Sequence, residues 1–88
     1  MNKQLSLEQA VEITRRAFLP YQTRVGINRD KGRLEIAVTD RHGDTVVDID
    51  DIENSEACDP ERLRGILAFA RDRAEARGFS LQPWWVKP

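Results

Sequence analysis

Residues 33–52, RLEIAVTDRHGDTVVDIDDI, decide the fold because they have the pattern of a β-hairpin. Apolar residues alternate with other residues on both sides of a short polar turn, which is the period of a strand with one buried face. If the apolar residues share that face, Val38 lies opposite Val47 and Ile36 lies opposite Ile49. The sequence therefore predicts two antiparallel strands in this register.

This register leaves His42 and Gly43 as a two-residue loop between Arg41 and Asp44. Such a loop is predicted to form a primed turn, in which both central residues have positive φ. Glycine adopts that conformation freely, and histidine tolerates it better than most residues. His42 therefore has a structural explanation. A functional role is the alternative, but the sequence places no nucleophile beside this single histidine, and loop tips are exposed by default.

Helices are predicted before and after the strands. Ser6 to Gln9 has the pattern of a capping box, and apolar residues at helical spacing follow until Pro20 ends the helix. A second helix is predicted to begin at Asp59-Pro60-Glu61, which supplies an N-cap, a proline at the first position and an acid at the positive end of the dipole. Gly78 is expected to end it.

Two residues inside the second helix need an explanation. Gly65 lowers the helix propensity by about 1 kcal/mol relative to alanine. We therefore expect it to permit a close approach to the sheet or to the first helix. Phe69 lies beside the main apolar stripe of this helix and is expected to widen it.

A further strand is predicted at residues 23–28, followed by a turn at 29–32 that ends in a left-handed glycine. The predicted fold class is α+β, with the order α-β-β-β-α: a three-stranded antiparallel meander with two helices packed on one face. The residues expected on the apolar side of the sheet are Val25, Ile27, Leu34, Ile36, Val38, Val47 and Ile49.

The bulk composition is typical of one small globular domain that spans residues 1–88, with 40% hydrophobic and 33% charged residues. The net charge of -1 predicts no general attraction to nucleic acid or to an anionic membrane. The first residues lack the apolar region of a signal peptide, and the longest apolar run, residues 66–70, is too short to span a membrane. Cys58 is the only cysteine, so no internal disulfide is possible. We expect a cytoplasmic protein.

The acidic residues are concentrated in the middle of the chain. Residues 44–59 contain seven acidic and no basic residues, whereas basic residues exceed acidic ones on both sides. A solvated connection explains this run. A weak divalent-cation site is an alternative, although a calcium loop that started at Asp48 would have Ile52 and Glu53 at its fifth and sixth positions. The prediction is no metal and no cofactor.

The order of helix, three antiparallel strands and helix is similar to that of double-stranded RNA-binding domains, which hold phosphates with the start of their second helix. The similarity covers topology. A lysine-rich helix start would be expected there, and residues 58–65 read CDPERLRG instead. A nucleic-acid-binding module is therefore an alternative function, and nucleic acid is not an expected partner.

The C-terminal aromatic tail, residues 79–88 (FSLQPWWVKP), contains both tryptophans. In one interpretation Phe79, Leu81 and one tryptophan fold back over an open end of the core. The segment could do so as a short added strand. In the other, Trp84 or Trp85 anchors a partner. Adjacent residues of an extended segment point in opposite directions, so only one tryptophan could be buried in the sheet.

Carboxylates gather on the sheet face away from the helices. In the predicted register Glu35 lies opposite Asp50, and Asp48 shares their face. Like charges across strands are destabilising. Either Arg24 and Arg33 reach them diagonally, or the face is a site for a basic partner.

No catalytic site is predicted. Cys58 lies near the start of the second helix, which favours a thiolate nucleophile, but the neighbouring acids Glu56 and Asp59 disfavour the negatively charged thiolate. Cys58 and His42 do not have the spacing of a zinc site. The predicted function is that of a small non-enzymatic protein-interaction domain that binds a protein partner or itself, as a homodimer. The predicted partner-binding residues are Trp84, Trp85, Glu35, Asp48 and Asp50.

Overall fold

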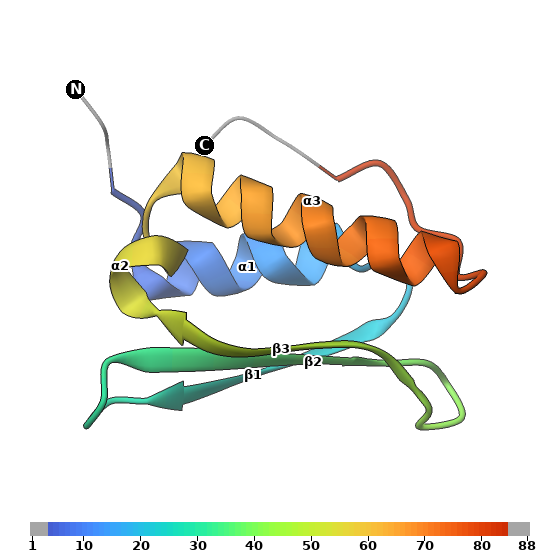
Figure 1. The fold of residues 1–88 in the computed structure, drawn as a ribbon, viewed down its shortest axis with the longest axis horizontal. Helices are drawn as coiled ribbons and strands as arrows, with labels where there is room; N and C mark the ends of the chain where they lie inside the picture. Colours follow the sequence, from blue (N-terminus) through green and yellow to red (C-terminus); the bar gives the residue numbers. More distant parts are fainter. Residues whose placement is uncertain (1–3, 85–88) are drawn as a thin grey trace.

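The fold has two layers, a sheet and a set of helices that covers one of its faces (Figure 1). In this computed structural model, residues 4–84 are described. The three strands form one antiparallel sheet in the order β1-β2-β3. The predicted α+β class, the meander and the placement of the helices on one face are confirmed. The elements are α1 (Leu7–Ala17), β1 (Gln22–Asn28), β2 (Arg33–Thr39), β3 (Thr45–Glu53), α2 (Asn54–Ala57) and α3 (Pro60–Ala76).

Both predicted helix starts are confirmed by their caps. The Ser6 hydroxyl accepts a hydrogen bond from the Gln9 amide at 3.1 Å, and the Gln9 side-chain oxygen accepts one from the Ser6 amide at 2.9 Å. The Asp59 carboxylate accepts hydrogen bonds from the amides of Glu61 and Arg62, at 3.0 and 3.4 Å. The side chains thus satisfy amides that have no partner inside the helix.

The short helix α2 was not predicted, because residues 52–58 were expected to be a connection between the last strand and the second predicted helix. The Asn54 amide donates to the Gly32 carbonyl at 2.9 Å, and the Leu5 amide donates to the Cys58 carbonyl at 2.7 Å. Ala57 is buried. The segment folds as a helical turn because distant parts of the chain bind both of its ends.

The predicted register is confirmed at the centre of the hairpin, where Val38 pairs with Val47 and Ile36 pairs with Ile49. The predicted register is wrong on both sides of that centre. At each side β3 has one residue more than β2, which makes a β-bulge. The first is Val46, so that Val46 and Val47 are both buried. A bulge of this kind lets consecutive residues face the same side of a sheet.

The second bulge lies at Asp50 and Asp51, which both lie opposite Glu35. Glu35 is therefore not paired with Asp50 alone, as predicted, because Asp51 shares the position opposite it. Strict alternation after Ile49 would place Ile52 on the outer face, whereas the extra residue returns Ile52 to the core. Asp51 has a φ of 63°, and it is the only described residue other than glycine with a positive φ.

The hairpin loop has three residues, 41–43, so the predicted two-residue primed turn is also wrong. The Gly43 amide donates to the Asp40 carbonyl at 3.1 Å, and the Asp40 amide donates to the Asp44 carbonyl at 2.9 Å. The Asp40 carboxylate accepts hydrogen bonds from the amides of His42 and Asp44. The Asp40 side chain thus stabilises the turn. Of the three loop residues only Gly43 has a positive φ, 84°, whereas a primed turn would need two.

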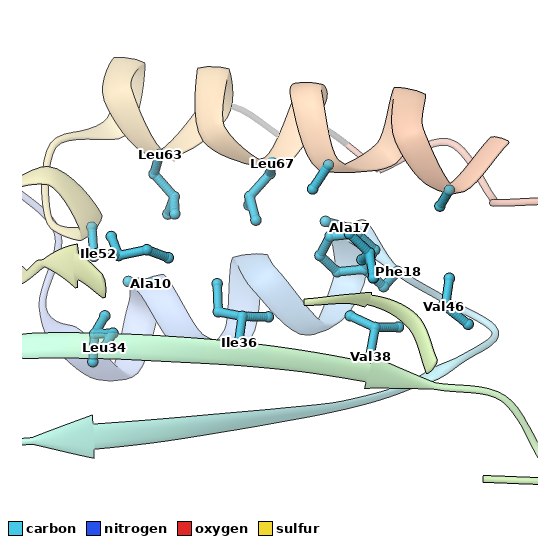
Figure 2. Close-up of a cluster of buried hydrophobic side chains, with 14 of the residues drawn as sticks. Ala10, Ala17, Phe18, Leu34, Ile36, Val38, Val46, Ile52, Leu63 and Leu67 are labelled. Atoms are coloured by element: carbon cyan, nitrogen blue, oxygen red, sulfur yellow. The ribbon is translucent and has the colours of Figure 1, made fainter. Parts of the chain in front are cut away.

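The core lies between β2 and the helices (Figure 2). Leu63 and Leu67 of α3 point toward the sheet, and Ile36 and Val38 of β2 point toward the helices. Phe18, at the end of α1, is fully buried between the layers. Of the predicted apolar face, Leu34, Ile36, Val38 and Val47 are buried and Val25 and Ile49 are half-buried, whereas Ile27 is 39% exposed on the edge strand β1.

Candidate functional site

The described part of the tail, residues 79–84, folds back over the core as one interpretation predicted. Phe79, Leu81 and Trp84 pack against it, and the Gln82 amide donates to the Leu19 carbonyl at 3.1 Å. Phe79 contacts the Tyr21 ring edge to face at 5.4 Å. No strand forms within residues 79–84. Trp85 lies outside the described residues.

Trp84 packs against a buried arginine on the helix side of the molecule. The Arg71 guanidinium is 5.3 Å from the Trp84 ring centroid, and its Nη1 donates to the Ala17 carbonyl at the end of α1. Burial lowers the pKa of Arg71 below its ordinary value, and the carboxylates of Glu75 and Asp72 oppose that shift. These contacts favour a structural role for Trp84.

The three predicted carboxylates, in contrast, are brought together on the outer face of the sheet. Glu35, Asp48 and Asp50 are exposed and line one hollow of about 740 Å³. Gly26 gives the Glu35 side chain room, because a Cβ at Gly26 would lie 2.8 Å from the Glu35 carboxylate oxygen. The structure does not join these acids to Trp84, which contacts Arg71 of α3 and does not line their hollow.

The expected neutralisation of these acids by arginine is not observed within residues 4–84. Arg33 pairs with Asp51 at 2.7 Å and approaches Glu53 at 3.9 Å. Glu35, Asp48 and Asp50 make no side-chain hydrogen bond or ion pair in the described part of the chain. Arg24, the other arginine expected here, lines the same hollow with Arg15 but forms no ion pair with these acids, so within residues 4–84 no arginine neutralises them by direct contact.

An apolar groove that the sequence did not predict lies on the helix side of β3, between this strand and α3. Its volume is about 410 Å³. Phe69 is 66% exposed here, so the prediction that it widens the buried stripe is wrong. Within residues 4–84 the sheet ends at β3, and no fourth strand covers this flank of α3. The lining residues are Val47, Asp48, Ile49, Gly65, Ile66, Phe69, Ala70 and Arg73.

Gly65 leaves this groove open. Apart from its chain neighbours and the backbone of its own helix, no heavy atom lies within 4 Å of the position that a Cβ of residue 65 would occupy, so the expected close approach to the sheet or to α1 is wrong. A side chain at this position would extend into the groove. The signal in the sequence was Phe69, an apolar residue beside the main stripe of the helix, whereas Ile66 belongs to that stripe and is only half-buried.

The groove runs beside the unpaired edge of β3. Arg77 Nη1 donates to the Val46 carbonyl at 2.8 Å and so covers the start of this edge. Beyond it, the edge strand carries Asp48, Asp50 and Asp51. Charged side chains on an edge strand oppose pairing with another copy of the same strand.

The two residues considered for chemistry in the sequence, His42 and Cys58, lie far apart. His42 is exposed in the β2–β3 loop, and Cys58 follows α2 at the opposite end of the sheet (Figure 1). Within residues 4–84, no three side chains of His, Cys, Asp or Glu gather to hold a metal ion. The divalent-cation alternative thus has no geometric support there. None of the helices described is both long and apolar enough for a membrane span.

Comparisons with the models of protein families, with curated proteins and with solved structures found no match to this chain. The candidate site is therefore defined by its geometry: an apolar groove on one side of an open strand edge and a row of carboxylates on the other.

Proposed function

We propose that this domain is a non-catalytic protein-interaction module that binds an extended segment of a partner chain along β3. One observation carries the proposal: an exposed apolar groove lies directly beside an unpaired strand edge. A segment that adds a strand to a sheet gains affinity from main-chain hydrogen bonds and specificity from alternate side chains in a neighbouring pocket. Both requirements meet at β3.

Binding of a second copy through the same edge is disfavoured. Two β3 strands paired with each other would bring Asp48 and Asp50 of one chain close to those of its partner. Like charges across paired strands are destabilising. The proposed partner is therefore a different chain.

Selection from a displayed library of random peptides tests this function. We expect peptides that bind the wild-type domain and lose about tenfold or more in affinity on Phe69→Gln and on Gly65→Gln. Phe69 is largely exposed and Gly65 faces open space, so both variants are expected to stay folded. Glutamine also has good helix propensity.

The matched control is Ile27→Thr, which removes an exposed apolar side chain from the other edge strand, β1. Peptide affinities should not change in this variant. Selected peptides that bind all three variants equally, or a selection that yields no binder, would contradict the proposed function.

A further inference from the structure

We infer that the segment taken up by β3 alternates apolar and basic residues. This inference rests on the proposed function and adds the chemical class of the partner. Side chains of a paired strand point alternately to the two faces of the sheet. On the helix side they enter the groove at Ile49, Ile66 and Phe69, and on the outer side they lie beside Asp48 and Asp50.

The helix side selects apolar side chains. Ile49 and Ile66 are half-buried in the groove and Phe69 is largely exposed beside them, so an apolar side chain placed there removes all three from water. Arg73 is the one basic residue that lines the groove, and its guanidinium lies 5.8 Å from the Phe69 ring centroid. Arg73 therefore packs on the Phe69 ring and enlarges the surface of the groove. As a cation it does not favour a basic side chain of the partner on this side.

The outer side selects basic side chains. Asp48 and Asp50 have no hydrogen bond or ion pair through their side chains within residues 4–84, whereas Asp51 is paired with Arg33. Both unpaired carboxylates line the hollow that also contains Glu35, and Arg15 and Arg24, which line it too, form no ion pair with them within residues 4–84. A Lys or Arg directly opposite an acid across paired strands is favourable. A partner with acidic residues there would be repelled.

Three capped synthetic peptides of equal length test this pattern by fluorescence anisotropy: one that alternates Lys and Val, one that alternates Glu and Val, and one with the Lys and the Val residues in separate blocks. We expect the alternating Lys peptide to bind about tenfold more tightly than either of the others. Amide hydrogens of β3 should exchange more slowly in its complex, because they gain strand partners.

Charge variants then locate the acidic partner groups. Asp48→Asn/Asp50→Asn is expected to weaken the alternating Lys peptide about tenfold, and Asp48→Lys/Asp50→Lys is expected to favour the alternating Glu peptide. The matched control is Asp30→Asn/Asp44→Asn, which removes two carboxylates from turns and leaves the acids of the outer face in place.

The outcomes separate the two proposals. Equal binding of the Lys and Glu peptides, with loss on Phe69→Gln, would overturn the alternation and leave the proposed function standing. Equal binding of the alternating and block Lys peptides would show charge attraction without strand pairing and would also overturn this inference. Binding of any of these peptides that is unchanged by Phe69→Gln would contradict the groove itself.

Discussion

Replacement of Gly65 by alanine is expected to stabilise the domain. In the middle of a helix, alanine is favoured over glycine by about 1 kcal/mol, since glycine loses more backbone freedom on folding. This gain is realised only if the added methyl group causes no clash. Apart from its chain neighbours and the backbone of its own helix, no heavy atom lies within 4 Å of the Cβ position at Gly65, so the gain is expected in full. For a domain of this size it corresponds to a rise in melting temperature of about 4–8 °C.

Urea unfolding followed by far-UV circular dichroism measures the effect. The midpoint should rise at an unchanged m-value, because the added methyl group does not change the surface exposed on unfolding. Gly26→Ala is the matched comparison, since a Cβ there meets the Glu35 side chain at 2.8 Å and the same substitution should gain less or destabilise. A lower free energy of unfolding for Gly65→Ala would refute the open groove, because it would require a neighbour that occupies this space.

Three further substitutions and one binding measurement test other parts of the structure. Gly43→Val should cost more than about 1 kcal/mol, because a β-branched residue is strained at a φ of 84°; an unchanged melting temperature would contradict this loop. Asp59→Ala should cost about 1 kcal/mol through loss of the α3 cap, and a urea midpoint equal to that of the wild type would argue against the cap. Arg71→Met should cost about 1.5–3 kcal/mol in urea unfolding because it leaves the Ala17 carbonyl without its buried donor, and it should shift the fluorescence of Trp84; no change in either would show that the contact is weak. Duplex RNA should not bind at physiological salt, since the amides at the start of α3 are bonded to Asp59; salt-sensitive micromolar binding in a titration would contradict this.

Interactions between residues close in the chain were the ones that the sequence predicted well. The cap of α1 joins Ser6 to Gln9, and the cap of α3 involves Asp59 and the residues that follow directly. Both act within one helical turn, so their pattern is visible in a few letters. The pairing of Val38 with Val47 was predictable for a similar reason, because a short loop leaves few registers that bury one apolar face.

The candidate site was predicted only in part. Glu35, Asp48 and Asp50 were expected on one face, and the structure places them along one hollow, although the bulge at Asp50 and Asp51 was not expected. The structure does not bring Trp84 to them, and this was not predictable from spacing, since the path of the tail depends on the contact between Trp84 and Arg71. That contact joins two segments whose proximity no local pattern encodes.

The sequence by itself determined the order of elements, the helix starts and the face of each strand that is buried, because these depend on local hydrogen bonds and on the period of apolar residues. Only the tertiary structure decided where β3 is bulged, that residues 54–57 form a helical turn, and that Phe69 is exposed. The bulge at Asp50 and Asp51 exists because Ile52 must return to a core formed by other elements. Phe69 is exposed because the sheet of the described residues ends at β3. A fourth strand would bury this apolar side chain in the core, whereas here it borders an open groove.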